Sequence, residues 1–322
     1  IKAAANLSEP SARLAYFGTH AKSFRFASRL FPRDALENVA GVYAFCRFTD
    51  DLVDEAPHTE SAVLRARMSA WLTLARKAYQ TGQSGVPLLD DVMGSARRHG
   101  VPFTYAEELV EGVGMDIHPR RYRTLEELRE YSYRVASVVG GWLTELFGIH
   151  DPWVLERAFA LGHAMQLTNI LRDVGEDLRV GRLYLPEDLL ELNGVDRDFL
   201  EAKSRSSSPM FPGYRKVLEE LMAAAEEDYR RAFEAIPLLP GFFQGPVAVA
   251  ARVYEGIHEE IRRNGFDNLT RRARTSLPRK LLLGMVALKD LARFRRRRDL
   301  GAENKRVESA RLALEKSREA AA

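Results

Sequence analysis

The sequence predicts an all-α fold in a single domain, and two observations support this prediction. Apolar residues recur at intervals of three and four along most of the 322-residue chain, which is the spacing of one buried face of an α-helix. The alternation of apolar and polar residues that is typical of strands is scarce. Apolar residues make up 46% of the chain, enough for a large core without disulfide bonds, and the single cysteine, Cys46, excludes a disulfide within the chain.

The predicted helices can be placed in order because turn residues separate them. Prolines mark breaks or first helical turns between the periodic segments, and the serine-rich segment at 204–213 is the clearest loop. No internal repeat, low-complexity tract or linker interrupts the series of about a dozen helices. The longest predicted helices span residues 35–55, 61–80, 104–117, 124–148, 152–178, 214–236, 246–264 and 278–297.

Charge and hydropathy argue against several classes of protein. The 48 basic and 45 acidic residues leave a net charge of only +3, which gives no support to a general nucleic-acid binder. The longest apolar stretches, at 135–143 and 281–288, fall short of the ~20 residues that span a bilayer, and no signal peptide is visible. The single cysteine favours a reducing compartment, so we expect a cytoplasmic protein.

A basic run at Arg293–Arg298, followed by Lys305 and Arg306, interrupts the even distribution of charge. Such runs usually form a solvated helix face or tail. The alternative is a role at a membrane, because each basic residue close to an anionic lipid surface contributes about 1 kcal/mol to binding. The second interpretation predicts peripheral association with the inner face of the membrane.

A polar stripe lies within the predicted helix at 152–178. Asn169, Asp173 and Asp177 are spaced four residues apart, so they share one line along the helix surface. The two carboxylates repel each other, which destabilises the helix unless another group neutralises them. A single pair of this kind is usually an ordinary solvated face.

The predicted helix at 35–55 ends with a similar arrangement. Asp50 and Asp54 are again four residues apart, and Arg47 precedes them by about one turn. If the two helices face each other, four carboxylates surround one cavity. Such oxygen ligands suit Mg²⁺, which is commonly held by few carboxylates together with substrate phosphates. Arg47 and Arg172 could bind the remaining phosphate oxygens, so the pattern predicts a magnesium–diphosphate site.

Two segments resemble a known family. YAFCRFTDDLVDE at 43–55 and QLTNILRDVGEDLRVGRLYLP at 166–186 resemble the squalene and phytoene synthases, which join two prenyl diphosphates head to head. The resemblance covers residues 14–290 in the family's order. It implies an isoprenoid-synthase-like helical bundle around a central cavity, with residues 1–13 as an N-terminal extension and 291–322 as a basic helix or tail.

The resemblance also implies roles for individual residues. The metal ligands or their close support would be Asp50, Asp54, Asn169, Asp173 and Asp177. The groups that would bind substrate or diphosphate are His20, Ala21, Lys22, Ser23, Tyr43, Arg47, Gln166, Arg172, Tyr184, Tyr254 and Arg271. Tyr131 and Lys280 occupy further site positions, and the implied catalytic set consists of Asp50, Asp54, Asp173, Asp177, Arg47 and Tyr131.

The chemistry that the resemblance implies has two steps. Diphosphate leaves one allylic chain, and the double bond of a second chain attacks the cation to form a cyclopropylcarbinyl diphosphate. A second ionisation rearranges this intermediate to the linear hydrocarbon. The implied cofactor is Mg²⁺, as about two or three ions, with Mn²⁺ as a substitute. Phytoene formation ends with loss of a proton and needs no NADPH, whereas squalene formation uses NADPH to supply a hydride.

Apolar residues could line a slot for the prenyl chains, although ordinary core packing explains each of them equally well. The candidates are Phe24, Phe26, Val135, Val138, Val139, Leu143, Leu161, Ala164 and Met165. Gly140 and Gly141 weaken their helix by about 1 kcal/mol each relative to alanine. Their presence indicates a kink or close backbone approach beside the substrate, or tight helix packing.

Several other polar residues allow narrower predictions. Tyr131 and Tyr133 are two residues apart, so at most one should point into the site. Asp116 is equally consistent with an acidic group near the metals and with a helix end. His163 is expected to be a core or supporting histidine rather than an acid–base group. The His–Asp pair at 150–151 precedes a proline and is expected in a turn.

The acidic pattern and the resemblance together predict a magnesium-dependent prenyltransferase. The resemblance is to the bacterial phytoene synthases in particular, and it implies conversion of two geranylgeranyl diphosphates to 15-cis-phytoene. GRLYLPED at 181–188 and RRNGFDNLTRRA at 262–273 favour that branch of the family. The alternatives are squalene, dehydrosqualene or hydroxysqualene synthesis from farnesyl diphosphate. An alternative of another class is a non-catalytic assembly factor of the same fold, but such proteins have typically lost aspartates that are intact here.

Overall fold

The molecule is built from helices joined by turns. The computed structural model describes residues 2–20, 24–54, 59–118, 120–205 and 211–296. Within these ranges the chain contains helices and no strand, so the all-α prediction is confirmed. No described helix is both long and apolar enough to cross a membrane.

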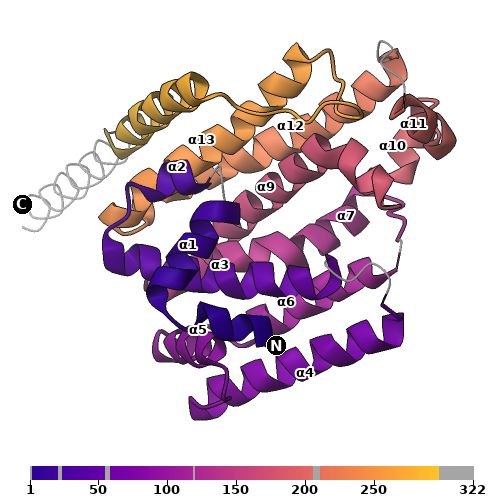
Figure 1. Ribbon diagram of the computed structural model, residues 1–322. Helices are drawn as coiled ribbons and strands as arrows, with labels where there is room; N and C mark the ends of the chain where they lie inside the picture. Colours follow the sequence, from indigo (N-terminus) through magenta and orange to yellow (C-terminus); the bar gives the residue numbers. More distant parts are fainter. Residues whose placement is uncertain (1, 21–23, 55–58, 119, 206–210, 297–322) are drawn as a thin grey trace, which may run out of the picture.

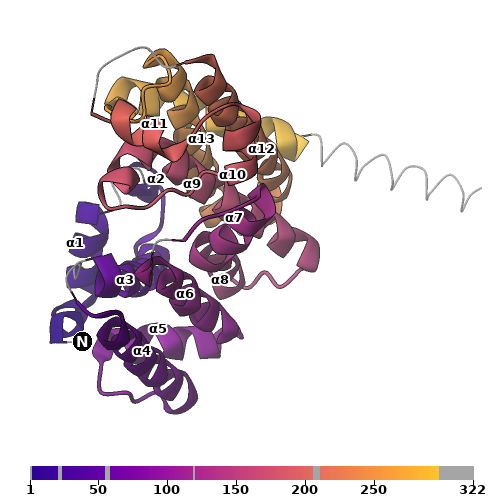
Figure 2. The same ribbon diagram turned by 90° about the vertical axis from the view of Figure 1, so that its right-hand side faces the viewer.

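The helices follow one another along the chain with mostly short connections. In the first half they are η1 (Lys2–Leu7), α1 (Pro10–His20), α2 (Phe24–Ser28), α3 (Arg33–Asp54), α4 (Ser61–Thr81), α5 (Pro87–Arg98), α6 (Thr104–Gly114) and η2 (Met115–Ile117). In the second half they are α7 (Leu125–Ser132), η3 (Tyr133–Ser137), α8 (Val138–Leu146), α9 (Pro152–Arg179), α10 (Glu187–Leu192), α11 (Arg197–Lys203), α12 (Pro212–Ala235), η4 (Ile236–Leu238) and α13 (Gly241–Arg263). A further helix spans residues 277–296. Figures 1 and 2 show α4 and α5 at one end of the molecule and α12 and α13 at the other.

The predicted long helices are present close to their expected ends, but two of them are divided. The segment predicted as one helix at 104–117 consists of α6 and the 3-10 turn η2. The segment predicted as one helix at 124–148 consists of α7, a π-helical turn, η3, and α8. Such turns are local insertions that frequently lie at functional sites. The sequence did not single out α5, which begins with Pro87 in its first turn, where proline is tolerated.

The start of α9 follows from its local sequence. Asp151 Oδ1 accepts the backbone N–H of Trp153 at 2.9 Å and that of Val154 at 3.1 Å, and Pro152 occupies the first turn. The carboxylate thus pairs N–H groups that every helix start leaves without an intrahelical partner. Asp151 is therefore a helix cap in a turn, as expected, and His150 precedes it.

A buried threonine fixes the rotation of α3. Thr49 is fully buried, and its hydroxyl accepts the indole N–H of Trp71 from α4 at 2.9 Å. The Trp71 ring packs against Phe48, with ring centroids 4.7 Å apart. Each helical residue is rotated by about 100° from the previous one. Holding Thr49 in the core therefore turns Asp50 away from α4.

A second buried threonine does the same for α9. Thr168 Oγ1 lies 3.0 Å from the Tyr229 hydroxyl of α12 and 2.9 Å from His258 Nε2 of α13. Asn169, the first residue of the polar stripe, directly follows. We call Asp50 with Asp54 on α3, and Asn169 with Asp173 and Asp177 on α9, the two acidic stripes. Each stripe begins one residue after a threonine that is hydrogen-bonded in the core.

His163 of α9 lies in the same interior and is a core histidine, as expected. It is 4% exposed, and its Nδ1 lies 2.6 Å from Asp228 Oδ2 of α12. Asp228 also contacts Arg129 at 3.1 Å and Arg231 at 3.3 Å. The network fixes α9 against α12.

Buried residues lie on both sides of the boundaries expected for the catalytic domain. Leu7 belongs to the core, and Arg13 Nη2 donates to Asp91 Oδ2 of α5 at 2.5 Å. At the other end, Leu291 is 4% exposed. The described part of the expected N-terminal extension and the first residues of the expected basic tail are therefore parts of the fold. Residues 297–322 lie outside the described residues.

Glycines let η3 and α8 approach α9 closely. A Cβ on Gly162 of α9 would lie 2.5 Å from Ser137 Cα of η3. A Cβ on Gly140 of α8 would lie 2.5 Å from the Ala158 carbonyl oxygen, and one on Gly141 would meet an aromatic ring. These separations are shorter than van der Waals contact. Tight helix packing is therefore the reason for both glycines of α8.

This packing yields a stability prediction. Gly162→Ala should lower the free energy of unfolding by about 1–3 kcal/mol, because the added methyl overlaps the backbone of η3. Gly241→Ala is the matched control, since no atom lies within 4 Å of its added Cβ. The control should be neutral or slightly stabilising. Denaturant unfolding of the two variants measures both effects, and equal stabilities would contradict the packing argument.

Candidate active site

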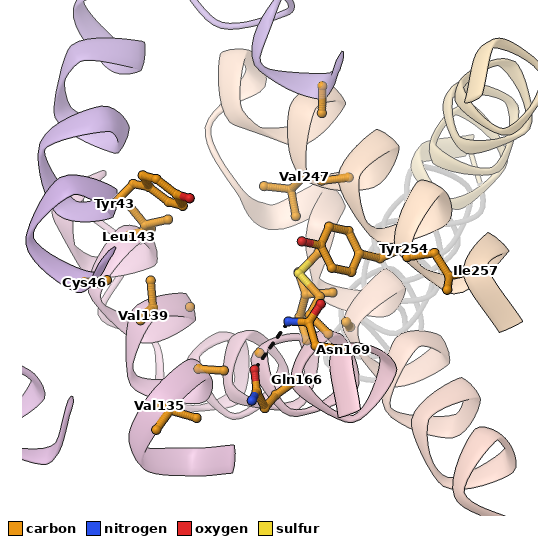
Figure 3. Close-up of a pocket in the computed structure, with 18 of the residues that line it drawn as sticks. Tyr43, Cys46, Val135, Val139, Leu143, Gln166, Asn169, Val247, Tyr254 and Ile257 are labelled. Carbon is orange, nitrogen blue, oxygen red and sulfur yellow. Dashed lines mark hydrogen bonds between the residues drawn. The ribbon is translucent and has the colours of Figure 1, made fainter. Parts of the chain in front are cut away.

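A cavity of about 920 Å³ separates α3 from α9 and α13. Figure 3 shows Tyr43 of α3 across the cavity from Asn169 of α9 and Tyr254 of α13, with Val139 and Leu143 of α8 on one side. The two acidic stripes line this one cavity through Asp50, Asp54, Asn169, Asp173 and Asp177. The helices that carry the stripes therefore face each other across a shared space.

Arginines neutralise part of the stripe on α9. Arg172 donates to Asp173 through Nε at 2.7 Å and Nη2 at 2.6 Å. From the loop after α13, Arg272 Nη2 donates to Asp173 Oδ2 at 3.0 Å, and its Nη1 lies 3.0 Å from Glu176 Oε2. Asp173 thus lies between two guanidinium groups, which form strong, oriented hydrogen bonds with carboxylates and with phosphates.

The stripe on α3 is paired differently. Arg182 Nη1 donates to Asp54 Oδ1 at 2.9 Å. Gly181, at φ 78°, turns the chain after α9 so that the backbone N–H of Arg182 donates to the Asp177 carbonyl at 2.8 Å. A residue other than glycine would be strained in this left-handed conformation. The turn brings Arg182 from the end of one stripe to the end of the other.

The other cavity-facing oxygens, those of Asp50, Asp177 and Asn169, are not fully neutralised or hydrogen-bonded by neighbouring side chains. Loss of solvation, together with the charge of Asp54, raises the pKa of Asp50 to about 8. Loss of solvation and the charge of Asp173 raise the pKa of Asp177 to about 7. The amide oxygen of Asn169 is buried without a hydrogen-bond partner among the described residues. These oxygens favour the approach of a cation.

The donor set fits a magnesium ion that is shared with a diphosphate. In the described part of the chain, no three carboxylate, histidine or cysteine side chains converge closely enough to hold an ion by themselves. Mg²⁺, however, usually keeps several waters and binds through one or two carboxylates together with substrate phosphates. The orphaned Asn169 oxygen and the uncompensated carboxylates therefore suit such a shared ion better than a site closed by protein alone.

Asp116 of η2 organises a cluster of tyrosines on the cavity wall. The Tyr131 hydroxyl donates to Asp116 Oδ2 at 2.7 Å, and the Tyr184 hydroxyl donates to Oδ1 at 2.9 Å. Burial, followed by the charge of Asp116, raises the pKa of Tyr131. Tyr133 is turned away, at 38% exposure, against the edge of Phe159. Asp116 is therefore an acidic group of the site rather than only a helix end.

Most of the other predicted site residues lie on the same cavity. These are Tyr43, Arg47, Gln166, Arg172, Tyr131, Tyr184, Tyr254 and Lys280. Gln166 accepts a hydrogen bond from Asn169 at 3.4 Å (Figure 3). The side chain of His20 and the whole of Ala21, Lys22 and Ser23 lie outside the described residues.

Arg271 is the exception among the predicted substrate-binding residues. It does not line the described cavity, its side chain is 70% exposed, and its contact with Asp267 is long, at 3.9 Å. Its neighbour Arg272 occupies the site instead. Adjacent residues of an extended loop point in different directions. The motif therefore identified the correct loop, but the arginine in the site is Arg272 and not Arg271.

Only some of the apolar residues that were predicted to line the cavity do so. Val135, Val139, Leu143, Leu161 and Met165 line it, as suggested. The side chain of Phe24 lies outside the described residues. Val138 and Ala164 are fully buried in the core instead, and the partly buried Phe26 packs against the core, because these residues lie on other faces of their helices. Further lining residues that the sequence did not single out are Phe31, Phe243, Val247 and Ile257.

Comparison with known proteins gives the same family as the motifs. Residues 17–279 match the family model described as squalene/phytoene synthase, and the chain belongs to this family. It is 35% identical over 279 residues to the 15-cis-phytoene synthase of a Paracoccus species, covering 85% of this chain and 89% of that protein. It is 37% identical over 267 residues to the phytoene synthase of Thermus thermophilus, covering 82% of this chain and 87% of that protein. A crystal structure of a dehydrosqualene synthase in complex with ligand matches with a TM-score of 0.78 at 27% identity, covering 88% of this chain and 96% of that chain.

The two adjacent arginines provide a matched test of the site. Arg272→Ala should weaken binding of inorganic pyrophosphate in the presence of Mg²⁺ by about tenfold or more, because it removes a charged donor beside Asp173. Arg271→Ala should bind pyrophosphate like the wild type. Calorimetric titration of both variants checks the assignment, which fails if Arg271→Ala has the larger effect.

Proposed function

We propose that this protein condenses two geranylgeranyl diphosphates head to head to 15-cis-phytoene in carotenoid biosynthesis, through a cyclopropylcarbinyl diphosphate. The supporting observation is the division of one cavity into two ends. The acidic stripes lie in the last turns of α3 and α9, whereas the lining residues earlier in the same helices, such as Val39 and Leu161, are apolar. A prenyl diphosphate has the same division between head group and chain. Family membership and the names of the two bacterial relatives support the choice of reaction.

The polar end would hold the diphosphate groups. Arg172 and Arg272 are already oriented by Asp173, so their remaining N–H donors can bind phosphate oxygens with little loss of side-chain freedom. The residues that would hold Mg²⁺ are Asp50, Asp54, Asn169, Asp173 and Asp177. When bound, Mg²⁺ would supply the positive charge that stabilises a leaving diphosphate.

The apolar end would hold the prenyl chains and exclude water. Val135, Val139 and Leu143 offer no hydrogen bonds to a water molecule near the reacting carbons. Water there would capture the allylic cation and end the reaction as an alcohol. The rings of Tyr43 and Tyr254 lie on opposite walls, and aromatic faces stabilise cations by electrostatic attraction.

Asp116 has a positioning role in this proposal. It accepts hydrogen bonds from Tyr131 and Tyr184, so it holds both hydroxyls at fixed places on the cavity wall. The rings of the two tyrosines stack with centroids 5.2 Å apart, which limits their rotation further. Tyr131 therefore meets the substrate in one orientation.

Two other functions are possible for a protein with this fold. Squalene, dehydrosqualene or hydroxysqualene synthesis from farnesyl diphosphate would use the same aspartates, and the dehydrosqualene synthase structure favours it as the second candidate. A non-catalytic assembly factor of the same fold would not need two intact acidic stripes on one cavity. The stripes therefore favour an enzyme.

Product identification separates the substrates. With geranylgeranyl diphosphate and Mg²⁺, the protein should form phytoene without NADPH. The value of kcat/KM for farnesyl diphosphate should be at least about tenfold lower than that for geranylgeranyl diphosphate. Mass spectrometry of the extracted hydrocarbon measures this. A preference for farnesyl diphosphate would transfer the assignment to the second candidate, and no hydrocarbon from either substrate would favour the assembly factor.

Ligand-induced stabilisation tests the acidic stripes separately from turnover. Mg²⁺ with inorganic pyrophosphate should raise the Tm of the wild type, because the pair binds only the folded state. Asp50→Asn and Asp173→Asn should lose most of this increase and most of the turnover. Unliganded Asp50→Asn should remain as stable as the wild type, whereas unliganded Asp173→Asn should be less stable because Arg172 and Arg272 lose the carboxylate that they share. Asp198→Asn, at an exposed position on α11, is the matched control. An unchanged increase in both site variants would disprove the metal-site assignment.

Peripheral association with the inner face of the membrane is part of the same proposal. In the basic run, the Arg293 side chain is 66% exposed, whereas Arg297 and Arg298 lie outside the described residues. Charge alone makes this contact weak and sensitive to salt. An apolar contribution is needed for stable binding.

A further inference from the structure

The 277–296 helix carries an apolar outer face that the proposed reaction does not use. Six of the thirteen exposed large apolar side chains in the described ranges lie on this helix, among them Leu281 at 53% and Met285 at 63% exposure. Leu30 after α2 and Phe242 of α13 add to it. We call this surface the apolar face; its residues are Leu30, Phe242, Leu277, Leu281, Leu282, Met285, Val286 and Leu288.

The apolar face is continuous across the helices that form it. A Cβ added at Gly245 of α13 would lie 3.9 Å from Leu288 Cδ2 and 4.0 Å from Leu30 Cδ1, so both side chains reach the same point. Figure 1 shows the 277–296 helix running beside α2 and α13. Isolated apolar residues on a surface need no explanation, but a contiguous patch marks an interaction site.

The inner face of the same helix is fully engaged, so the outward residues are not the result of a loosely docked helix. Ala287 is fully buried, and Leu291 is 4% exposed. Phe294 stacks on Phe233 of α12, with ring centroids 6.4 Å apart. The helix therefore has two apolar faces, of which one packs on the protein and the other meets solvent.

The charge of this helix favours an anionic partner. Its second half presents exposed Lys289, Arg293 and Arg296 next to the apolar face. Its single acidic residue, Asp290, is engaged by Arg252 at 2.8 Å. An apolar stripe bordered by basic residues is the composition of a helix that lies in the interface of an anionic bilayer.

The apolar face lies directly outside the apolar wall of the cavity. Phe31 and Phe243 line the cavity, while their neighbours Leu30 and Phe242 are exposed. In the same way Lys280 lines the cavity while Leu281 faces outward. One layer of protein therefore separates the cavity from whatever covers the apolar face.

We propose that the apolar face inserts into the acyl region of an anionic lipid bilayer, with Lys289, Arg293 and Arg296 at the headgroups. The apolar end of the cavity then faces the membrane. The proposal of lipid binding rests only on the residues of this surface. Transfer of a hydrocarbon product into the bilayer on this side rests additionally on the proposed function.

Vesicle flotation of the full chain tests the apolar contribution. Wild-type protein should float with mixed phosphatidylcholine–phosphatidylglycerol vesicles, and the double variant Leu281→Gln, Met285→Gln should partition about tenfold less strongly or worse. The matched control is Val63→Gln with Leu192→Gln, which changes two exposed apolar residues elsewhere and should float like the wild type. Equal flotation of both double variants would overturn the proposal.

Two further measurements make the result specific. Lys289→Gln with Arg293→Gln should reduce flotation with the anionic vesicles and should weaken its dependence on salt. Met285→Trp should show quenching by brominated lipids, whereas Leu192→Trp should not. Absence of quenching at position 285 would overturn insertion even if flotation persists.

The controls also separate this proposal from its competitors. If sedimentation shows a wild-type dimer that Leu281→Gln with Met285→Gln dissociates, and vesicles do not bind, the face joins two copies of the chain and the proposal is wrong. Asp173→Asn should float like the wild type although it loses turnover. Failure of the proposed reaction would therefore leave lipid binding intact, and failure of lipid binding would leave detergent-supported turnover intact.

Discussion

Repulsion among carboxylates that face one cavity is the interaction on which the rest of the site depends. Asp50 and Asp177 lie where loss of solvation and neighbouring charges both disfavour ionisation. The protein maintains this arrangement by pinning Thr49 and Thr168 in the core immediately before the two stripes. It offsets the charge only partly with arginines, so the site remains selective for added positive charge.

The fold and the stripes could be predicted because both follow from local spacing. Residues four apart share a helix face wherever the helix lies, and this rule placed Asp50 and Asp173 correctly on the cavity wall. Arg182 and Arg272 could not be assigned in this way, since their partners are distant in sequence and their directions depend on a turn and a loop. Val138 packs in the core and Val139 lines the cavity because successive residues of a helix are rotated by about 100°.

Polarity changes along the helices that line the cavity. On α3, Val39 and Tyr43 precede Asp50 and Asp54, and on α9, Leu161 and Met165 precede Asp173 and Asp177. A substrate with a charged head and a long apolar chain matches this order. The close packing of η3 and α8 on α9 through Gly162 and Gly140 holds together the helices that form the cavity walls.

Locating the metal directly tests the central claim, that both stripes act together on one metal-bound diphosphate. A crystal soaked with Mn²⁺ and a non-hydrolysable prenyl diphosphate analogue would show the ion by its anomalous scattering. The account predicts ions between α3 and α9, at about 2.2 Å from carboxylate oxygens of both stripes. A diphosphate held by Arg172 and Arg272 with no ion between the two helices would contradict it.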